Sequence, residues 1–377
     1  MSKYLLLFLL AFSCWQTSIA QGITLPPSGE NQKSSVRQNI GNIVTVQVDY
    51  NSPNVHAPNG EDRKGKIWGT LVPYGLTDQG FGLREPAPWR AGANENTTID
   101  FSHDVMIEGK PLPAGKYGLH LIVEETGPWT WIFSKNHSAW GSYFYTPRED
   151  ALRVQVQPRE NAYTEFLNYT FTDRQNDEAV LELQWENKAV PMRITVPNMT
   201  ELYIAKIERE LQSSPGFDAD NYAAAANFLL QENYNLDKAL TWANQAINPP
   251  VGQESFNHIS TKANVLLKMK RNEEALEAFH MAMNMSDATP FAVHGLGRNL
   301  VSQGEKEMAL RVFTMNYEKH KGAWPTNVGM TRGLAAVGKY DEALKYAQAA
   351  LAEAPDDVNR TSLTSMIERL KSKQDIN

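Results

Sequence analysis

The sequence predicts a two-part protein, in which an antiparallel β-sandwich or jelly-roll-like domain precedes an all-α helical repeat array. Between about residues 40 and 197, apolar and polar residues alternate with a period of two, as in half-buried strands. Beyond residue 216 the apolar period becomes helical, and one dipeptide returns about every 34 residues. The length of 377 residues is enough for two or three domains.

The first residues have the features of a secretory signal peptide. Lys3 precedes an apolar stretch over residues 4–15, and a small-residue cleavage site ends at Ala20. This stretch is too short to cross a membrane. We therefore expect residues 1–20 to be removed and the mature protein to be soluble and periplasmic or secreted. Cys14 is the single cysteine and lies in the removed segment, so no disulfide forms. Its acylation, which would make a lipoprotein, is disfavoured by the bulky residue two positions earlier.

The β part follows a short polar segment. Residues 21–38 hold two prolines and many polar residues, so we expect a flexible linker. Residues 39–197 then contain about nine predicted strands, with separate strands at 179–185 and 192–196. This part has more tryptophan than a thin sandwich core needs. The residues are Trp68, Trp89, Trp129, Trp131, Trp140 and Trp185.

Several short motifs occur in order within the β part. They are GTLVPYG at 69–75, PWRAGANE at 88–95, LPAGKYGL at 112–119, WGS at 140–142 and DALRV at 150–154. Together they resemble the DUF2911 domain, a family of uncharacterised exported proteins in which tetratricopeptide repeats sometimes follow. The resemblance implies a fold and an exported location. It implies no activity, so it assigns no catalytic residue.

The helical part repeats a pair of helices. The dipeptide Ala-Leu recurs at intervals of 36, 34 and 34 residues, starting at Ala239, Ala275, Ala309 and Ala343. Only a small residue lets neighbouring helices approach closely, so these alanines mark the second helix of each pair. The pattern resembles the tetratricopeptide repeat, with about four units over residues 216–372. In the first unit, Asn227 falls at the small position of the first helix. We expect a connecting helix at 198–215 and a tail at 373–377.

The sequence has no motif for familiar enzymatic chemistry. It lacks a phosphate-binding glycine loop, a His-Glu-x-x-His helix and a Gly-x-Ser-x-Gly turn. His103 and His120 would point to opposite faces of neighbouring strands, so they cannot share a metal ion. A net charge of −7 without a run of Lys or Arg argues against a nucleic-acid surface. We expect no metal, no cofactor, no nucleic-acid partner and no transmembrane span.

The segment from residue 89 to residue 95 is the best candidate for a ligand site in the β part. It brings an indole, a guanidinium, an amide and a carboxylate together around a glycine, and Trp with Arg suits a planar or sugar-like group. The candidate residues are Trp89, Arg90, Asn94, Glu95, His120 and Trp140. The alternative is structural: an ion pair between Arg90 and Glu95 would hold a loop beneath Trp89. Glycoside hydrolysis would need a second carboxylate near Glu95, and none is evident.

A second candidate surface lies in the repeats. In this repeat family the position after the small residue lines the concave face. These residues are Phe228, Asn264, Arg298 and Arg332, with His294 on the same face as Arg298. Two stacked arginines with an asparagine suit a carboxylate or an acidic peptide. The alternative is that they are ordinary solvated residues of a groove.

The preferred interpretation is an exported scaffold without enzymatic activity. Its β domain would bind an unknown ligand, and its repeats would hold a protein or peptide partner of acidic character. The alternative is a hydrolase or carbohydrate-active protein with a site at residues 89–95. The observation that separates these classes is whether the polar groups of that segment open into a pocket.

Overall fold

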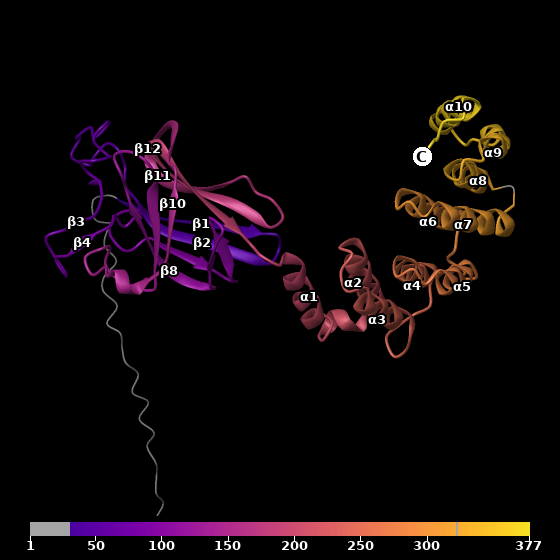
Figure 1. Cartoon of the computed structure of the whole chain (residues 1–377), viewed down its shortest axis with the longest axis horizontal. Helices are drawn as coiled ribbons and strands as arrows, with labels where there is room; N and C mark the ends of the chain where they lie inside the picture. Colours follow the sequence, from indigo (N-terminus) through magenta and orange to yellow (C-terminus); the bar gives the residue numbers. More distant parts are fainter. Residues whose placement is uncertain (1–30, 322) are drawn as a thin grey trace, which may run out of the picture. The chain divides into compact units, whose positions relative to one another are not determined.

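The chain forms two units, Met1–Met199 and Thr200–Asn377. The structure, a computed structural model, describes residues 31–321 and 323–377. The predicted signal peptide and its cleavage site lie outside the described residues. Figure 1 labels many of the elements of both units, and its colours follow the chain from its beginning to its end.

The first unit is an antiparallel β-sandwich with two main sheets. The larger sheet has the strand order β1-β2-β5-β8-β9-β10, and the smaller has the order β11-β12-β6-β7. The strands are β1 (Gln32–Ile40), β2 (Val44–Ser52), β3 (Thr77–Asp78), β4 (Pro86–Ala87), β5 (Thr98–Phe101), β6 (Val105–Ile107), β7 (Lys110–Leu112), β8 (Gly115–Ile122), β9 (Trp129–Ser134), β10 (Asp150–Val156), β11 (Arg159–Thr172) and β12 (Glu178–Thr195). The short pair β3–β4 lies in the long connection between β2 and β5.

The alternating apolar pattern builds the core between the two sheets. In β2, Val44, Val46 and Val48 are buried, and the residues between them are partly exposed. Trp131 of the larger sheet and Trp185 of the smaller are among the largest fully buried side chains. Burying a side chain of this kind stabilises the fold by roughly 1.5–3 kcal/mol. The core therefore follows directly from the period of two.

A cluster of four indoles accounts for much of the excess of tryptophan. The ring of Trp68 lies 5.9 Å from that of Trp89, 5.0 Å from that of Trp129 and 5.8 Å from that of Trp185. Trp89 and Trp185 stack at 6.0 Å with 19° between their planes. Trp68 and Trp89 belong to the connection between β2 and β5, so the cluster anchors this long loop on the core.

Two expectations about the strands are wrong. Residues 32–38, expected in a linker, belong to β1, which pairs with β2 along its whole length. Their polar composition hid this strand, because most of its side chains are exposed. The segments 179–185 and 192–196, expected as two strands, form the single strand β12. A left-handed residue, Glu186 with φ of 52°, lets β12 continue through an irregularity in its pairing with β11.

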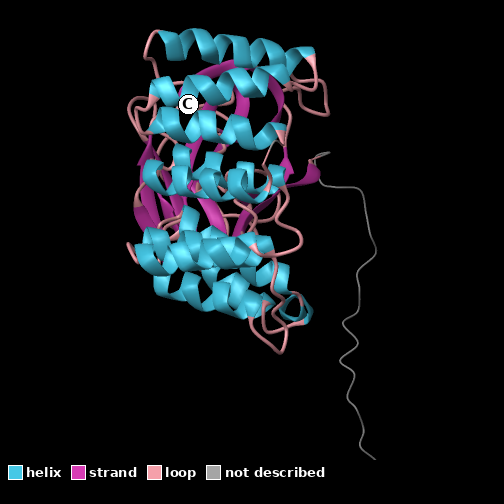
Figure 2. Cartoon of the chain, turned by 90° about the vertical axis from the view of Figure 1, so that its right-hand side faces the viewer, coloured by secondary structure: helices cyan, strands magenta, loops and turns pink. Residues whose placement is uncertain are grey.

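The second unit is a stack of helix pairs. Within its described residues, α1 (Met199–Glu210) precedes the pairs and α10 (Asp357–Lys371) follows them. The pairs are α2 (Ala219–Gln231) with α3 (Leu236–Ile247), α4 (Phe256–Lys268) with α5 (Asn272–Met283), α6 (Pro290–Ser302) with α7 (Lys306–Lys319), and α8 (Trp324–Ala336) with α9 (Tyr340–Ala352). Figure 2 shows these helices layered one above another. In the described part of the chain, no helix is long and apolar enough to cross a membrane.

Small residues lie where the helices of the stack meet. Ala239, Ala275, Ala309 and Ala343 have no exposed surface. On the first helices the corresponding residues are Ala226, Ala263, Gly297 and Thr331, which are also buried. The repeated alanine therefore marks close helix packing, as the spacing predicts.

The predicted register of the first pair is wrong by one residue. The turn between α2 and α3 has four residues, 232–235, whereas the turn between α4 and α5 has three, 269–271. Counting back from Ala239 therefore placed Asn227 at the small position, which Ala226 occupies. The residue after the small position is Asn227. Phe228, expected in the groove, is partly buried and packs 5.7 Å from the ring of Tyr203 on α1.

The ring of Phe313 occupies a space that three glycines leave open. A Cβ atom on Gly297 of α6 would lie 2.3 Å from this ring, and one on Gly329 or Gly333 of α8 would lie 2.6 or 2.8 Å from it. Phe313 is fully buried. The spacing between α6, α7 and α8 is thus set by one aromatic side chain from α7 against backbone without side chains.

We predict opposite effects for two glycines of α6. Gly297→Ala should lower the free energy of unfolding by about 1–3 kcal/mol, because its methyl group overlaps the ring of Phe313. Gly295→Ala is the matched control, since a Cβ there meets nothing within 4 Å. It should raise stability by up to about 1 kcal/mol through helix propensity. Urea unfolding of both variants measures the difference, and equal effects would contradict the packing described.

Candidate functional site

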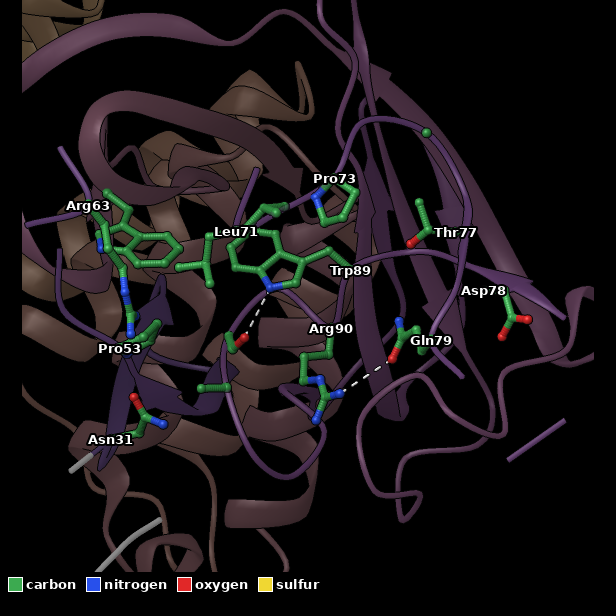
Figure 3. A pocket seen from close by; sticks show the side chains of 15 residues that line it. Asn31, Pro53, Arg63, Leu71, Pro73, Thr77, Asp78, Gln79, Trp89 and Arg90 are labelled. Atoms are coloured by element: carbon green, nitrogen blue, oxygen red, sulfur yellow. Dashed lines mark hydrogen bonds between the residues drawn. The ribbon is translucent and has the colours of Figure 1, made fainter. Parts of the chain in front are cut away.

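The first candidate site is a pocket in the β unit beside Trp89. It has a volume of about 420 Å³. In Figure 3, Arg63 and Pro53 lie on one side of Trp89, and Gln79 lies on the other. Leu71 and the buried Trp185 also line it. Sequence reasoning found Trp89 and Arg90 but missed the other lining residues. For Trp185, the excess of tryptophan was the available signal.

Trp89 is fixed by both its backbone and its indole. Its backbone N–H donates to the carbonyl of Leu121 at 3.0 Å, and the N–H of Leu121 donates back at 2.8 Å. The indole Nε1 donates to the carbonyl of Gly92 at 3.1 Å. A Cβ on Gly92 would lie 2.5 Å from Oγ1 of Thr97, so this turn requires glycine. The indole therefore has one defined position in the pocket.

The guanidinium of Arg90 holds three loops together. One nitrogen donates to the carbonyl of Asn94 at 2.5 Å, and another donates to Oε1 of Gln79 at 3.4 Å. The ring of Tyr143 lies 4.9 Å from its central carbon. A Cβ on Gly141 would be only 2.2 Å from that carbon. Arg90 is therefore a positioning residue whose donors are used by the protein.

Glu95 points away from Trp89 and Arg90, so the predicted convergence of the segment does not occur. The ion pair between Arg90 and Glu95, which the sequence offered as the structural alternative, does not form either. Glu95 instead lies 2.8 Å from Nζ of Lys33 and accepts a hydrogen bond from Asn51 at 2.8 Å. Burial raises the pKa of Glu95, but the hydrogen bond and charge of Lys33 outweigh it and leave the pKa lowered. The positive φ angles of Ala91 and Asn94 turn the chain between the two ends of the segment.

His120 and Trp140 do not line the pocket. His120 is buried and hydrogen-bonded through Nδ1 to Oγ of Ser142 at 2.9 Å. Burial, with a smaller effect from the charge of Arg90, lowers the pKa of His120 to about 3, so the ring is neutral at pH 7. A serine beside a histidine is also the pattern of an activated nucleophile. Because Ser142 is only 1% exposed, the pair fastens the loop to β8 and is closed to substrates. Trp140 lies in this loop with 53% of its surface exposed.

The described residues contain no arrangement of three or more His, Cys, Asp or Glu side chains that could hold a metal ion. His103 follows β5 and forms a hydrogen bond with the neighbouring Ser102 at 2.9 Å. His120, as described above, is bonded to Ser142.

The second candidate site lies on the first helices of the pairs. A hollow of about 440 Å³ is lined by side chains of α2, α4 and α6, most of them polar. Its amides are Asn227, Gln231, Asn264, Asn299 and Gln303. Asn227 donates to Oγ1 of Thr261 at 3.2 Å. The buried Oδ1 of Asn264 has no hydrogen-bond partner among the described residues.

Two arginines occur one repeat apart on α6 and α8, and the first of them precedes Asn299, which lines this hollow. Arg298 is exposed and Arg332 is half-buried. The ion pairs of arginines in this unit involve Arg271 and Arg360, and among the described residues neither Arg298 nor Arg332 forms one. Arg332 donates to Oδ1 of Asn377 at 3.4 Å, and its buried Nε has no partner in the described part of the chain. Burial and then the charge of Arg298 lower the pKa of Arg332. The two cations are therefore close and uncompensated.

His294 lies next to this arginine pair. Its ring is 5.7 Å from that of Phe313, and its buried Nδ1 has no partner among the described residues. Burial, followed by the charges of Arg332 and Arg298, lowers the pKa of His294 to about 4, although a hydrogen bond to the backbone of Pro325 acts in the opposite direction. An anion bound here would face two guanidiniums and a neutral imidazole.

The comparisons agree with this division of the chain. The family model described as "Protein of unknown function (DUF2911)" matches residues 31–194, which confirms the resemblance of the β unit. No curated protein matches the chain.

The helical unit is similar to solved tetratricopeptide repeat structures. One is YrrB, a TPR protein with an unusual peptide-binding site, at 20% identity and a TM-score of 0.26, covering 45% of this chain and 86% of that one. A tetratricopeptide repeat protein from Parabacteroides merdae matches at 16% identity and 0.29, covering 46% and 68%. A thermophilic TPR protein in Thermus thermophilus matches at 17% identity and 0.30, covering 45% and 90%.

We predict that His294 makes folding depend on pH. The unfolded chain takes up the proton of this histidine near pH 6.5, whereas the folded chain takes it up near pH 4. The free energy of unfolding should therefore fall as the pH is lowered from 6.5 to 4, and this contribution should level off below pH 4. In His294→Gln the decline over this range should be shallower. The exposed His280→Gln is the control, and denaturant unfolding at several pH values measures the slopes. Identical slopes for His294→Gln and the native chain would contradict a buried neutral imidazole.

Proposed function

We propose that this is an exported scaffold protein whose helical array holds a partner protein through an extended acidic segment. The observation that carries this proposal is the pair Arg298 and Arg332, which forms no ion pair among the described residues and continues from Asn264 and Asn299 of the amide-lined hollow. The acidic segment of the partner would lie across the first helices of the four pairs, which are α2, α4, α6 and α8.

The amide-lined hollow and the pair of arginines are each complementary to such a segment. The amides of Asn227, Asn264 and Asn299 can donate to and accept from a peptide backbone in any sequence. A carboxylate placed between Arg298 and Arg332 would form charge-assisted hydrogen bonds, which are roughly twice as strong as neutral ones. It would also remove the repulsion between the two guanidiniums. Affinity should therefore depend on the acidic residue, and it should weaken as salt rises.

A hydrolytic function has less support. Asp78 is the one carboxylate among the described residues that line the pocket beside Trp89. Glu95, the acid expected from sequence, faces a different hollow with Lys33 and Lys116. Hydrolysis of a glycoside by the usual mechanism needs two carboxylates across one bond.

Export rests on the sequence pattern of residues 1–20. We expect the mature chain isolated from the producing cell to begin at Gln21, because a small-residue site ends at Ala20. Intact-mass measurement and N-terminal sequencing of the protein from the exported fraction check this. A chain that keeps Met1, or that is found with the cytoplasmic proteins, would contradict export.

We predict that acidic peptides bind the array through Arg298. The probe is a pool of acidic octapeptides, compared with the same pool in which Asp and Glu are replaced by Asn and Gln. Arg298→Glu should weaken binding of the acidic pool by at least about tenfold, because a charge-assisted bond becomes a repulsion. Arg332→Gln, a milder change at the half-buried position, should act in the same direction.

The matched control is Arg311→Glu on α7, which has the same charge change at an exposed position in a hollow of α5 and α7 side chains. Fluorescence anisotropy measures affinity, and thermal unfolding verifies the fold. Binding that is equal for the two pools, or equally affected by Arg311→Glu, would reject the proposed groove.

A further inference from the structure

The pocket beside Trp89 has an apolar platform that the proposed function of the array does not use. Trp89 is partly exposed in the pocket, and Leu71 and Pro73 extend the apolar surface around it. Beneath it, Trp89 stacks on Trp185 at 6.0 Å. Because Trp68 packs against both rings, the platform is rigid. A flat, fixed indole of this kind suits a ligand with a flat apolar face.

Polar side chains surround this apolar platform. Thr77, Asp78 and Gln79 lie on one side of Trp89 and Arg63 on the other (Figure 3). Asp78 is exposed, with one carboxylate oxygen accepting the N–H of Gly80 at 2.8 Å. A hydroxyl, a carboxylate, an amide and a guanidinium around one indole provide donors and acceptors in several directions. They suit a ligand with several hydroxyl groups at its edge.

The charges in the pocket argue against an anionic ligand. Arg90 directs its nitrogens to Asn94 and Gln79 and packs on Tyr143. Nε of Arg63 lies 3.8 Å from a carboxylate oxygen of Glu61. The remaining charged group at the rim is the carboxylate of Asp78. Arg90 forms no ion pair among the described residues, but two of its donors are already bonded within the protein, and Asp78 adds a negative charge at the rim. A neutral ligand with several hydroxyl groups is therefore favoured over a phosphate or carboxylate.

We propose that this pocket binds a neutral sugar ring, as a monosaccharide or as one unit of a glycan. The apolar face of the ring would stack on Trp89, and its hydroxyls would bond to Thr77 and Asp78. The volume of about 420 Å³ is at the small end of the range for small-molecule pockets, roughly 300–1,000 Å³, which fits one or a few rings. The β unit would then recognise a glycan independently of the partner held by the helical array.

The test titrates the mature full-length chain with defined sugars. The probes are glucose, galactose, mannose, xylose and N-acetylglucosamine, together with β-linked trisaccharides of glucose, xylose and N-acetylglucosamine. Adenine is the planar ligand without hydroxyls, and inorganic phosphate is the anion. Calorimetry measures affinity, and tryptophan fluorescence reports whether the indole cluster is reached.

Three variants and one control locate the site. Asp78→Ala removes an exposed polar group and Thr77→Val a partly exposed one. Each should weaken sugar binding by roughly five- to tenfold, with the melting temperature unchanged. Trp89→Phe reduces the platform and should abolish most of the fluorescence change. Trp140→Phe removes an exposed indole outside the pocket and should leave affinity unchanged. If Asp78→Ala does not fold, Thr77→Val still shows whether sugar binding depends on this pocket.

The proposal is supported if at least one sugar binds and Thr77→Val weakens it while Trp140→Phe does not. It is overturned if no sugar binds at tens of millimolar, or if adenine or phosphate binds in preference. Sugar binding that survives in both Asp78→Ala and Thr77→Val also overturns it, because the ligand would then lie elsewhere.

Discussion

Both units depend on close contacts that form only where a residue has a small side chain or none. In the helical unit, Gly297 and Ala309 leave room for the helices of adjacent pairs to meet around Phe313. In the β unit, Gly141 lets the guanidinium of Arg90 lie against the backbone of a neighbouring loop. Both contacts lie at residues of the candidate sites, since Gly297 precedes Arg298 and Arg90 lines the pocket beside Trp89. A single methyl group at Gly297 or Gly141 would therefore disturb the packing and a candidate site together.

The sequence predicts the fold well where burial follows one regular period. The valines of β2 alternate with partly exposed residues, and the alanine spacing identifies the helix pairs. β1 was missed because its side chains are mostly exposed, so its position is decided by backbone hydrogen bonds to β2 that leave no apolar pattern. The predicted register of α2 was wrong by one residue, because counting back from Ala239 assumed a turn of three residues and the turn has four. Local geometry, which composition does not encode, decided both cases.

The candidate site was predicted only in part for a similar reason. Sequence proximity placed Trp89, Arg90 and Glu95 together, but the left-handed residues Ala91 and Asn94 send them in different directions. The partners that matter, such as Gln79 and Trp185, come from distant parts of the chain. In the array, the repeat spacing places Arg298 and Arg332 after Gly297 and Thr331, which are both buried on α6 and α8. The spacing could not show that neither arginine forms an ion pair, because the nearby charges depend on how all the neighbouring helices pack.

The position of β1 at the edge of the larger sheet has a consequence for the behaviour of the protein at high concentration. An edge strand leaves one row of backbone N–H and C=O groups without a partner strand, which can recruit another chain. β1 carries Lys33 and Arg37 at exposed positions and otherwise mostly small or amide side chains. Two such edges bury little apolar surface on contact, and the cation of Arg37, which forms no ion pair among the described residues, opposes their approach. The same polar composition that concealed this strand in the sequence thus protects the sandwich from lateral association into fibrils.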